Sequence, residues 1–249
     1  WMLEFYWRMK KREKRKKRKR MNTLKRNQQK KLPLIRTQLP MKKLLTLVFA
    51  LIAVSASART ISWRSGIGDT LVDSGGLSLT DAFIFELGAF DAGFTPDATK
   101  YGEWESRWHA FGQATYEPLL GNGWEPGAQY FTKDTTMLGG QLSSESPPLA
   151  SYAFTAGTQA FLWVYDSKTV APTSEWALVG GSTWNFPASD LLNLTPVVWE
   201  LNSADLAIWG GANDLRGDGL YTALPGSFDL QTAAVPEPAG LILLGLAGW

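Results

Sequence analysis

The stretch AFLWVY, residues 160–165, has no charged side chain, and its only polar side-chain groups are the indole N–H of Trp163 and the hydroxyl of Tyr165. Successive side chains of a β-strand point to opposite faces, so a strand here would be apolar on both faces. Such a strand is expected in the middle of a sheet or between two layers. Residues 82–90 (AFIFELGAF) are also strongly apolar and aromatic, and they predict a second core strand.

Shorter strand candidates surround these two stretches. They are separated by clusters of Gly, Pro, Asn, Asp and Ser, as in 143–148 and 210–219. The candidates are Arg59–Arg64, 129–132, Gln159–Tyr165, 175–179, 183–186, 197–201 and 207–209. Residues 187–192 are expected to form one helical turn. Many short strands without an internal repeat predict a mainly β fold, a single β-sandwich or jelly-roll-like domain.

One amphipathic helix is expected over about 95–112. Thr95 is a suitable N-cap, Pro96 suits the first helical position, and Asp97 favours the positive end of the helix dipole. Gly112 suits the C-terminal stop. Aromatic residues at spacings of three, four and three mark one face, which we expect to pack on a sheet. They are Tyr101, Trp104, Trp108 and Phe111.

The net charge of +2 hides a division of the chain. Of the 25 Lys and Arg residues, 18 lie between Arg8 and Lys43. From Arg59 onward seven basic residues stand against 21 acidic ones, a net charge of −14. An acidic body repels phosphates, so we expect no nucleic acid partner. Cysteine is absent, which excludes disulfides, thiolate metal sites and cysteine nucleophiles.

Residues 41–58 (MKKLLTLVFALIAVSASA) have the three parts of a secretory signal peptide. Two lysines precede the apolar run 44–54, and the small residues Ala56 and Ala58 define a signal peptidase site that would cut before Arg59. Residues 1–40 form a basic extension, which we expect to be disordered because like charges repel. We interpret this extension as upstream sequence, with Met41 as the natural start. The alternative is an arm that binds nucleic acid or anionic lipid.

The tetrapeptide Val235-Pro236-Glu237-Pro238 is expected to be stiff and extended, because proline fixes its own backbone and restricts its predecessor. A protease or transpeptidase can read such a backbone in a cleft. Residues 239–249 carry no charge and would gain by entering lipid. These 11 residues are fewer than the ~20 that a spanning helix needs. The alternative for this run is a buried C-terminal strand or helix.

This order of features, over residues 235–249 only, resembles the PEP-CTERM sorting signal of exported bacterial proteins. That signal has a proline–acid–proline box, a transmembrane helix and a terminal basic cluster. Here the apolar run is about half of the ~20-residue helix length and the basic cluster is missing, so we interpret the tail as incomplete at Trp249.

The resemblance implies that two enzymes process the chain, a signal peptidase and a membrane exosortase. It implies export, transient anchoring in the inner membrane, and cleavage at or near Pro236-Glu237-Pro238. The product would pass to the cell envelope, the cell surface or the extracellular matrix. Relatives are common in bacteria that make exopolysaccharide, a possible partner.

The sequence therefore predicts four parts: the extension 1–40, the signal peptide 41–58, a β-rich exported domain 59–234 and the sorting signal 235–249. We expect a non-enzymatic surface or matrix protein with no metal and no cofactor. The alternative is a secreted carbohydrate-binding module or glycoside hydrolase that acts on exopolysaccharide.

Few residues of the body suggest chemistry. His109 is the single histidine, and a general base would need a nucleophile and an orienting partner. Glycoside hydrolysis needs two acids, for which the candidates are Glu86 with Asp91, or Glu103 with Glu105. We expect His109 to be structural and regard neither acid pair as diagnostic.

Two further features have an ordinary structural alternative. Oxygen ligands for calcium could come from Asn213, Asp214 and Asp218, but a solvated turn is the simpler interpretation. The tripeptide Arg216-Gly217-Asp218 is too short to indicate adhesion. The body holds nine tryptophans, which could stack on sugars if exposed but are expected mainly to fill the core.

Overall fold

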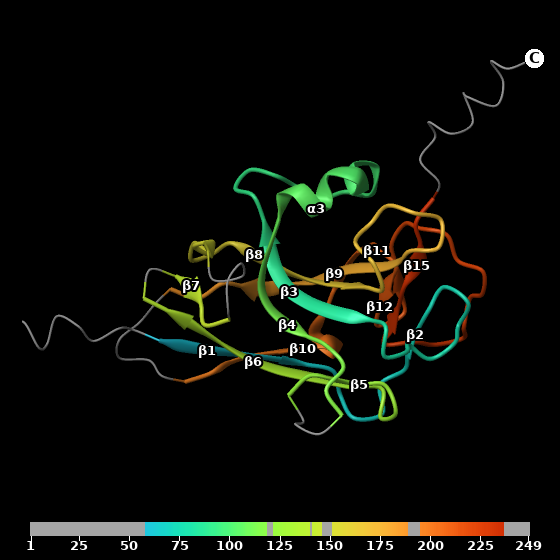
Figure 1. The fold of residues 1–249 in the computed structure, drawn as a ribbon, viewed down its shortest axis with the longest axis horizontal. Coiled ribbons are helices and arrows are strands. Elements are labelled where there is room, and N and C mark those ends of the chain that lie inside the picture. Colours follow the sequence, from blue (N-terminus) through green and yellow to red (C-terminus); the bar gives the residue numbers. More distant parts are fainter. Residues whose placement is uncertain (1–57, 119–121, 140, 146–150, 189–194, 237–249) are drawn as a thin grey trace, which may run out of the picture. The chain divides into compact units, whose positions relative to one another are not determined.

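The computed structural model describes residues 58–118, 122–139, 141–145, 151–188 and 195–236. They form a mainly β domain consistent with a β-sandwich, which confirms the predicted fold class (Figure 1). The strands are β1 (Arg59–Arg64), β2 (Leu71–Val72), β3 (Ile84–Phe90), β4 (Trp108–Ala114), β5 (Trp124–Glu125), β6 (Tyr130–Leu138), β7 (Leu142–Ser143), β8 (Gln159–Tyr165), β9 (Glu175–Asn185), β10 (Val197–Glu200), β11 (Leu206–Trp209), β12 (Gly211–Ala212), β13 (Leu215–Arg216), β14 (Leu230–Gln231) and β15 (Ala233–Ala234).

Three sheets make up the domain. The first has the order β10-β1-β6-β5, with β7 paired to β6. The second has the order β11-β9-β8-β3-β4, with β15 paired to β9. A smaller third sheet, β13-β12-β14-β2, lies at the end of the domain where β15 also lies (Figure 1). Side chains of the first two sheets share one hydrophobic core, the inter-sheet core, as expected of a sandwich.

Strand β8 occupies the middle of the second sheet, between β9 and β3. Leu162 and Val164 belong to the inter-sheet core, whereas Trp163 and Tyr165 belong to a second buried group, the outer cluster, on the opposite face. The prediction of a central strand buried on both faces is therefore confirmed. The fully buried members of the outer cluster include Trp104, Trp163, Trp176 and Val235.

Short helical segments between β3 and β4 cover the outer cluster. They are η1 (Ala98–Glu103) and α3 (Trp104–Arg107), and Trp104 from α3 is completely buried against Trp163, Trp176 and Trp209. The cap is Asp97 rather than Thr95, because an Asp97 carboxylate oxygen accepts from Thr99 N at 2.9 Å.

The predicted helix over 95–112 is wrong in its C-terminal part. The chain becomes strand β4 at Trp108 and pairs with β3 from Phe90↔Trp108 to Phe85↔Ala114. Trp108 packs in the outer cluster, whereas Phe111 packs in the inter-sheet core. Pairing with β3 and burial on two faces outweigh the helical spacing, since propensity is a weak prior against tertiary context.

Gly112 is therefore not a helix stop but a point of close approach between β4 and β6. A Cβ at Gly112 would lie 2.3 Å from Thr135 Oγ1 and 3.3 Å from Trp63 Nε1. We expect Gly112→Ala to lower the free energy of unfolding by about 1–3 kcal/mol, because the two sheets must separate. Urea denaturation measures this loss. The control is Gly102→Ala, whose Cβ would meet no atom within 4 Å, and equal stability of the two variants would contradict the prediction.

Candidate functional site

The second sheet holds the chain up to the first residue of the predicted sorting motif. β15 pairs with β9 through Ala233↔Trp176 and Ala234↔Glu175. Val235 N then donates to Ser174 O at 2.9 Å, and the Val235 side chain is completely buried in the outer cluster. Regular pairing thus ends where the motif begins. Pro236 is half-buried, and Glu237 and Pro238 lie outside the described residues.

Glu175 fastens this end of the sheet to two other segments. Its Oε2 accepts from Ser74 N at 3.1 Å and from Thr232 Oγ1 at 2.7 Å, and its Oε1 accepts from the Ser74 hydroxyl. The carboxylate thereby joins the turn after β2, strand β9 and the residue before β15. Sequence reasoning missed Glu175, because its partners lie 101 and 57 residues away along the chain.

The predicted signal peptidase site lies directly before the first strand. Arg59 is the first residue of β1 and is aligned with Met137 of β6. Ala58 precedes the strand, and Ala56 lies outside the described residues. A cut between Ala58 and Arg59 would leave every residue of β1 in the product.

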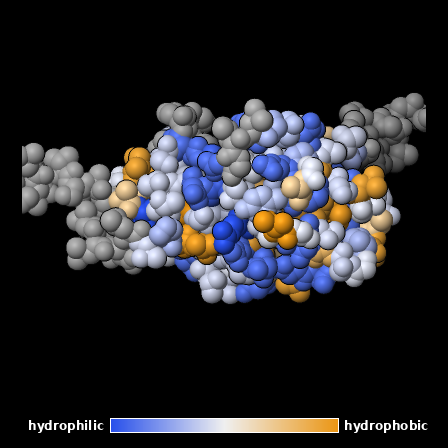
Figure 2. All heavy atoms as spheres, turned by 90° about the horizontal axis from the view of Figure 1, so that it is seen from below, coloured by the Kyte–Doolittle hydropathy of each residue, from blue (hydrophilic) through white to orange (hydrophobic). Residues whose placement is uncertain are grey.

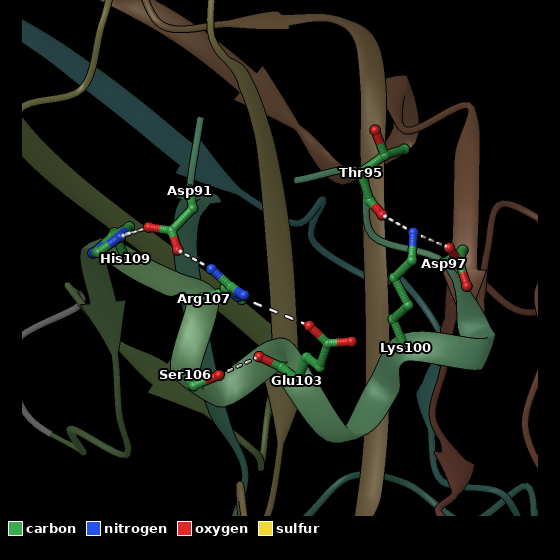
Figure 3. Close-up of polar contacts among 8 residues, drawn as sticks. All are labelled: Asp91, Thr95, Asp97, Lys100, Glu103, Ser106, Arg107 and His109. Carbon is green, nitrogen blue, oxygen red and sulfur yellow. Dashed lines mark hydrogen bonds and ion pairs between the residues drawn. The ribbon is translucent and has the colours of Figure 1, made fainter. Parts of the chain in front are cut away.

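Asp91, His109 and Arg107 form a polar group at the end of β3 (Figure 3). His109 lies on β4 rather than on a helix, and its Nε2 is 2.7 Å from Asp91 Oδ1. Arg107 Nη1 lies 3.4 Å from Asp91 Oδ2. The His109 ring stacks on Tyr152 with centroids 3.7 Å apart and planes inclined by 6°.

This geometry orients the imidazole without offering it a nucleophile. The hydroxyl of Ser106, three residues away along the chain, donates to the backbone carbonyl of Glu103 instead (Figure 3). Tyr152 meets the ring face rather than a ring nitrogen. Among the contacts that the structure describes for this group, no nucleophile pairs with the imidazole to complete a relay of nucleophile, base and orienting acid.

The hydrogen bond from His109, with a further contribution from Arg107, lowers the pKa of Asp91 below its ordinary value. A carboxyl group with a depressed pKa in the folded state stabilises the fold above its unfolded pKa, ~4, and this stabilisation is lost as the pH falls through the folded-state value. We expect Asp91→Asn to lower the melting temperature at pH 6 but to have little effect near pH 2. Melting curves across this range, with the exposed Asp81→Asn as control, test it. An unchanged difference between wild type and Asp91→Asn across the range would contradict it.

Glu86 is a buried carboxylate that accepts four hydrogen bonds. Tyr165 Oη at 2.7 Å and Gln113 Nε2 at 3.0 Å donate to Oε1. Lys168 Nζ at 2.6 Å and Trp108 Nε1 at 2.8 Å donate to Oε2. Burial, together with the Glu86 charge, raises the pKa of Tyr165 well above its usual range. The signal in the sequence was the lone charge in AFIFELGAF, which needs a cationic partner once buried.

The two predicted acid pairs do not form a catalytic pair of carboxylates. Glu86 points to the outer side of the second sheet, where Trp108 and Tyr165 lie, and Asp91, five positions further along, pairs with His109. Asp91 lies just beyond the end of β3, and the two carboxylates share no hydrogen-bond partner. Glu103 and Glu105 are both exposed on the helical segments, where Glu103 pairs with Arg107 at 3.9 Å.

The region of Asn213, Asp214 and Asp218 is built as a turn. Asn213 and Asp214 have positive φ angles of 50° and 65° and connect β12 to β13. The Asn213 amide donates to the carbonyls of Leu201 and Ala204, and Asp214 Oδ1 accepts from Phe228 N. Both side chains thus bind backbone groups of neighbouring segments. Within the described residues, no group of three or more His, Cys, Asp or Glu side chains could hold a metal ion.

Arg216 is also held by the fold. Its guanidinium lies over the ring of Phe228, 4.9 Å from the centroid, and donates to Pro225 O at 3.0 Å. A Cβ at Gly217 would lie 2.7 Å from the backbone of Ile208. Arg216 is thus held by neighbouring residues and Gly217 packs closely on β11, although Arg216 and Asp218 themselves remain exposed.

The nine tryptophans of the body are all buried, which supports the core interpretation over a sugar-stacking platform. They are Trp63, Trp104, Trp108, Trp124, Trp163, Trp176, Trp184, Trp199 and Trp209. A hollow beside the inter-sheet core is lined by aromatic and aliphatic side chains and one arginine, with no acid among them. These are Trp63, Arg64, Leu87, Phe131, Leu162, Trp184, Trp199 and Leu201.

The described residues include no helix that is long and apolar enough to cross a bilayer. The described residues define a β-sandwich-like domain. No protein-family model matches the chain, and neither a search of curated proteins nor a search of solved structures finds a significant match.

Proposed function

We propose that the chain is an exported bacterial protein of the cell surface or extracellular matrix. Signal peptidase removes residues up to Ala58, and an exosortase then processes the tail at Val235-Pro236-Glu237-Pro238. The body has no catalytic role and serves as the delivered domain. The tail holds the protein in the inner membrane until it is cut.

One observation carries this proposal. The two predicted processing sites flank the folded domain without interrupting a strand. β1 begins at Arg59, immediately after the predicted signal peptidase cut, and β15 ends at Ala234, immediately before the sorting motif. Removal of both terminal segments would therefore leave every strand pairing of the three sheets in place.

Burial of Val235 adds a constraint on the second cut. The backbone N–H of Val235 is hydrogen-bonded to Ser174 O, and the Val235 side chain is buried. A protease therefore cannot bind Val235 in an extended cleft unless this hydrogen bond breaks and the side chain leaves the core. We therefore place the cut after Pro236 rather than before it.

We expect mass spectrometry of the exported protein to show a chain that begins at Arg59 and ends between Pro236 and Pro238. This product should require an active exosortase in the host. Glu237→Ala should leave the tail attached, because the acid of the box is lost, whereas the exposed-site control Glu105→Ala should be processed normally. An intact tail in a host with a working exosortase, or normal processing of Glu237→Ala, would contradict the proposal.

A further inference from the structure

The most exposed large apolar side chains of the described residues gather at one end of the domain. Ile67, Leu77, Leu224 and Leu220 are 91%, 70%, 68% and 55% exposed. All four lie on the connections that lead into or out of the third sheet. Figure 2 shows apolar residues at the right-hand end of the molecule, the end where Figure 1 places β2. Single exposed leucines are ordinary on protein surfaces, but such a concentration indicates a contact surface.

Three of these residues form a surface beside the point where the chain leaves the fold, and we call Leu77, Leu220 and Leu224 the exit surface. The N–H groups of Thr222 and Ala223 both donate to Ser74 O at 2.9 Å, which joins the 220–224 segment to the turn that carries Leu77. Leu220 exchanges two backbone hydrogen bonds with Ala234, at 3.1 and 2.9 Å. The exit surface therefore adjoins β15 directly.

The turn that presents Leu77 is firmly built. Asp73 Oδ1 accepts from Gly75 N at 2.8 Å and from Leu77 N at 2.9 Å, and Asp73 N donates to Leu77 O at 2.8 Å. The outward position of Leu77 is thus fixed by hydrogen bonds rather than left to a loose loop. A turn whose backbone is already fixed loses little conformational entropy when its exposed side chain meets a partner.

The distance that the chain can span after Pro236 identifies the partner of the exit surface. Ala239, where the uncharged run begins, is the third residue after Pro236, and an extended chain spans at most about 3.6 Å per residue, roughly 11 Å in all. If the run 239–249 enters lipid, the end of the domain that carries β15 must lie within that distance of the bilayer. The leucines of the exit surface are among the exposed side chains at that end.

We propose that the exit surface rests on the lipid bilayer while the tail is inserted, so that leucine side chains contact the headgroup and acyl boundary. This inference rests on the proposed function, since it requires a membrane-inserted tail. The contact is apolar rather than electrostatic, because the chain from Arg59 onward carries seven basic and 21 acidic residues. Zwitterionic lipid is therefore the expected surface, and anionic lipid should weaken the contact at low salt.

The absence of cysteine permits a direct test with the full chain. Single variants Leu77→Cys, Leu224→Cys and, as control, Val198→Cys are labelled with an environment-sensitive fluorophore. Val198 is 50% exposed on β10, in the first sheet. On binding to phosphatidylcholine vesicles, emission at 77 and 224 should rise about twofold or more and be quenched by spin-labelled lipid, while emission at 198 stays unchanged.

The outcomes separate the two proposals. A chain that floats with vesicles through its tail, but whose labels at 77 and 224 do not respond, overturns the bilayer contact and leaves the proposed sorting intact. A chain that does not float overturns the bilayer contact, whereas the sorting proposal is decided by mass spectrometry of the exported product. A rise in emission without vesicles that grows with protein concentration shows that a second copy of the chain covers the surface, and it also overturns the bilayer contact.

Discussion

Replacing Glu86 by alanine is expected to lower the free energy of unfolding by about 3 to 4 kcal/mol. The substitution would leave Tyr165, Trp108 and Lys168 without the acceptor that now satisfies them. Trp108 and Tyr165 are buried, so water cannot fully replace the lost hydrogen bonds. Lys168 keeps about a quarter of its side chain exposed, so water can partly solvate its ammonium group, which limits the loss of stability from the broken ion pair.

Urea denaturation of the exported domain gives this difference, with the exposed Glu105→Ala as control, which should change stability by less than about 0.5 kcal/mol. A double-mutant cycle with Lys168→Met separates the ion pair from the rest of the network. Lys168→Met should cost about 1–3 kcal/mol more in the wild type than in the Glu86→Ala background. Equal costs in the two backgrounds would show that the two side chains are not coupled.

The second large effect is expected at Trp104. Trp104→Ala should lower the free energy of unfolding by about 3–5 kcal/mol, because it leaves a cavity among Trp163, Trp176 and Trp209. The residue lies on a four-residue helix that has little stability by itself, so its burial is what fastens the segment to the sheet.

Thermal and urea denaturation measure the loss, and Trp104→Phe should retain part of the stability because the ring still fills some of the space. Tyr116→Ala, at a site where the side chain is 47% exposed, is the matched control and should stay within about 0.5 kcal/mol of wild type. A loss at Trp104 no larger than that of the control would show that the helical cover contributes nothing to the outer cluster.

The acidic residues Glu86 and Asp91 show how much of the site the sequence could predict. The apolar and aromatic composition of residues 82–90 correctly predicted a core strand, and β3 runs from Ile84 to Phe90. That Glu86 and Asp91 bind different partners could not be foreseen from this stretch, because Asp91 lies just beyond the end of β3 and pairs with His109 of β4. The partners of Glu86 could not be foreseen, because Lys168 is 82 residues away and reaches it only across the second sheet.

The helical prediction failed for a related reason. Aromatic residues at Tyr101, Trp104, Trp108 and Phe111 satisfy a helical period, yet a strand that is buried on both faces accepts aromatics at nearly any spacing. Which structure forms at Trp108 depends on pairing with β3 and on contact with Thr135 of β6 through the space left by Gly112. Neither contact is encoded within the segment itself.

The sequence by itself determined the fold class and the central position of β8, because strand alternation and burial are properties of neighbouring residues. It also predicted processing sites before Arg59 and at Val235-Pro236-Glu237-Pro238. The tertiary structure alone decided that Val235 is buried, that Glu175 fastens the end of the sheet, and that exposed leucines adjoin the exit of the chain. These features depend on contacts between residues far apart along the chain, and such contacts exist only once the sheets have closed around their cores.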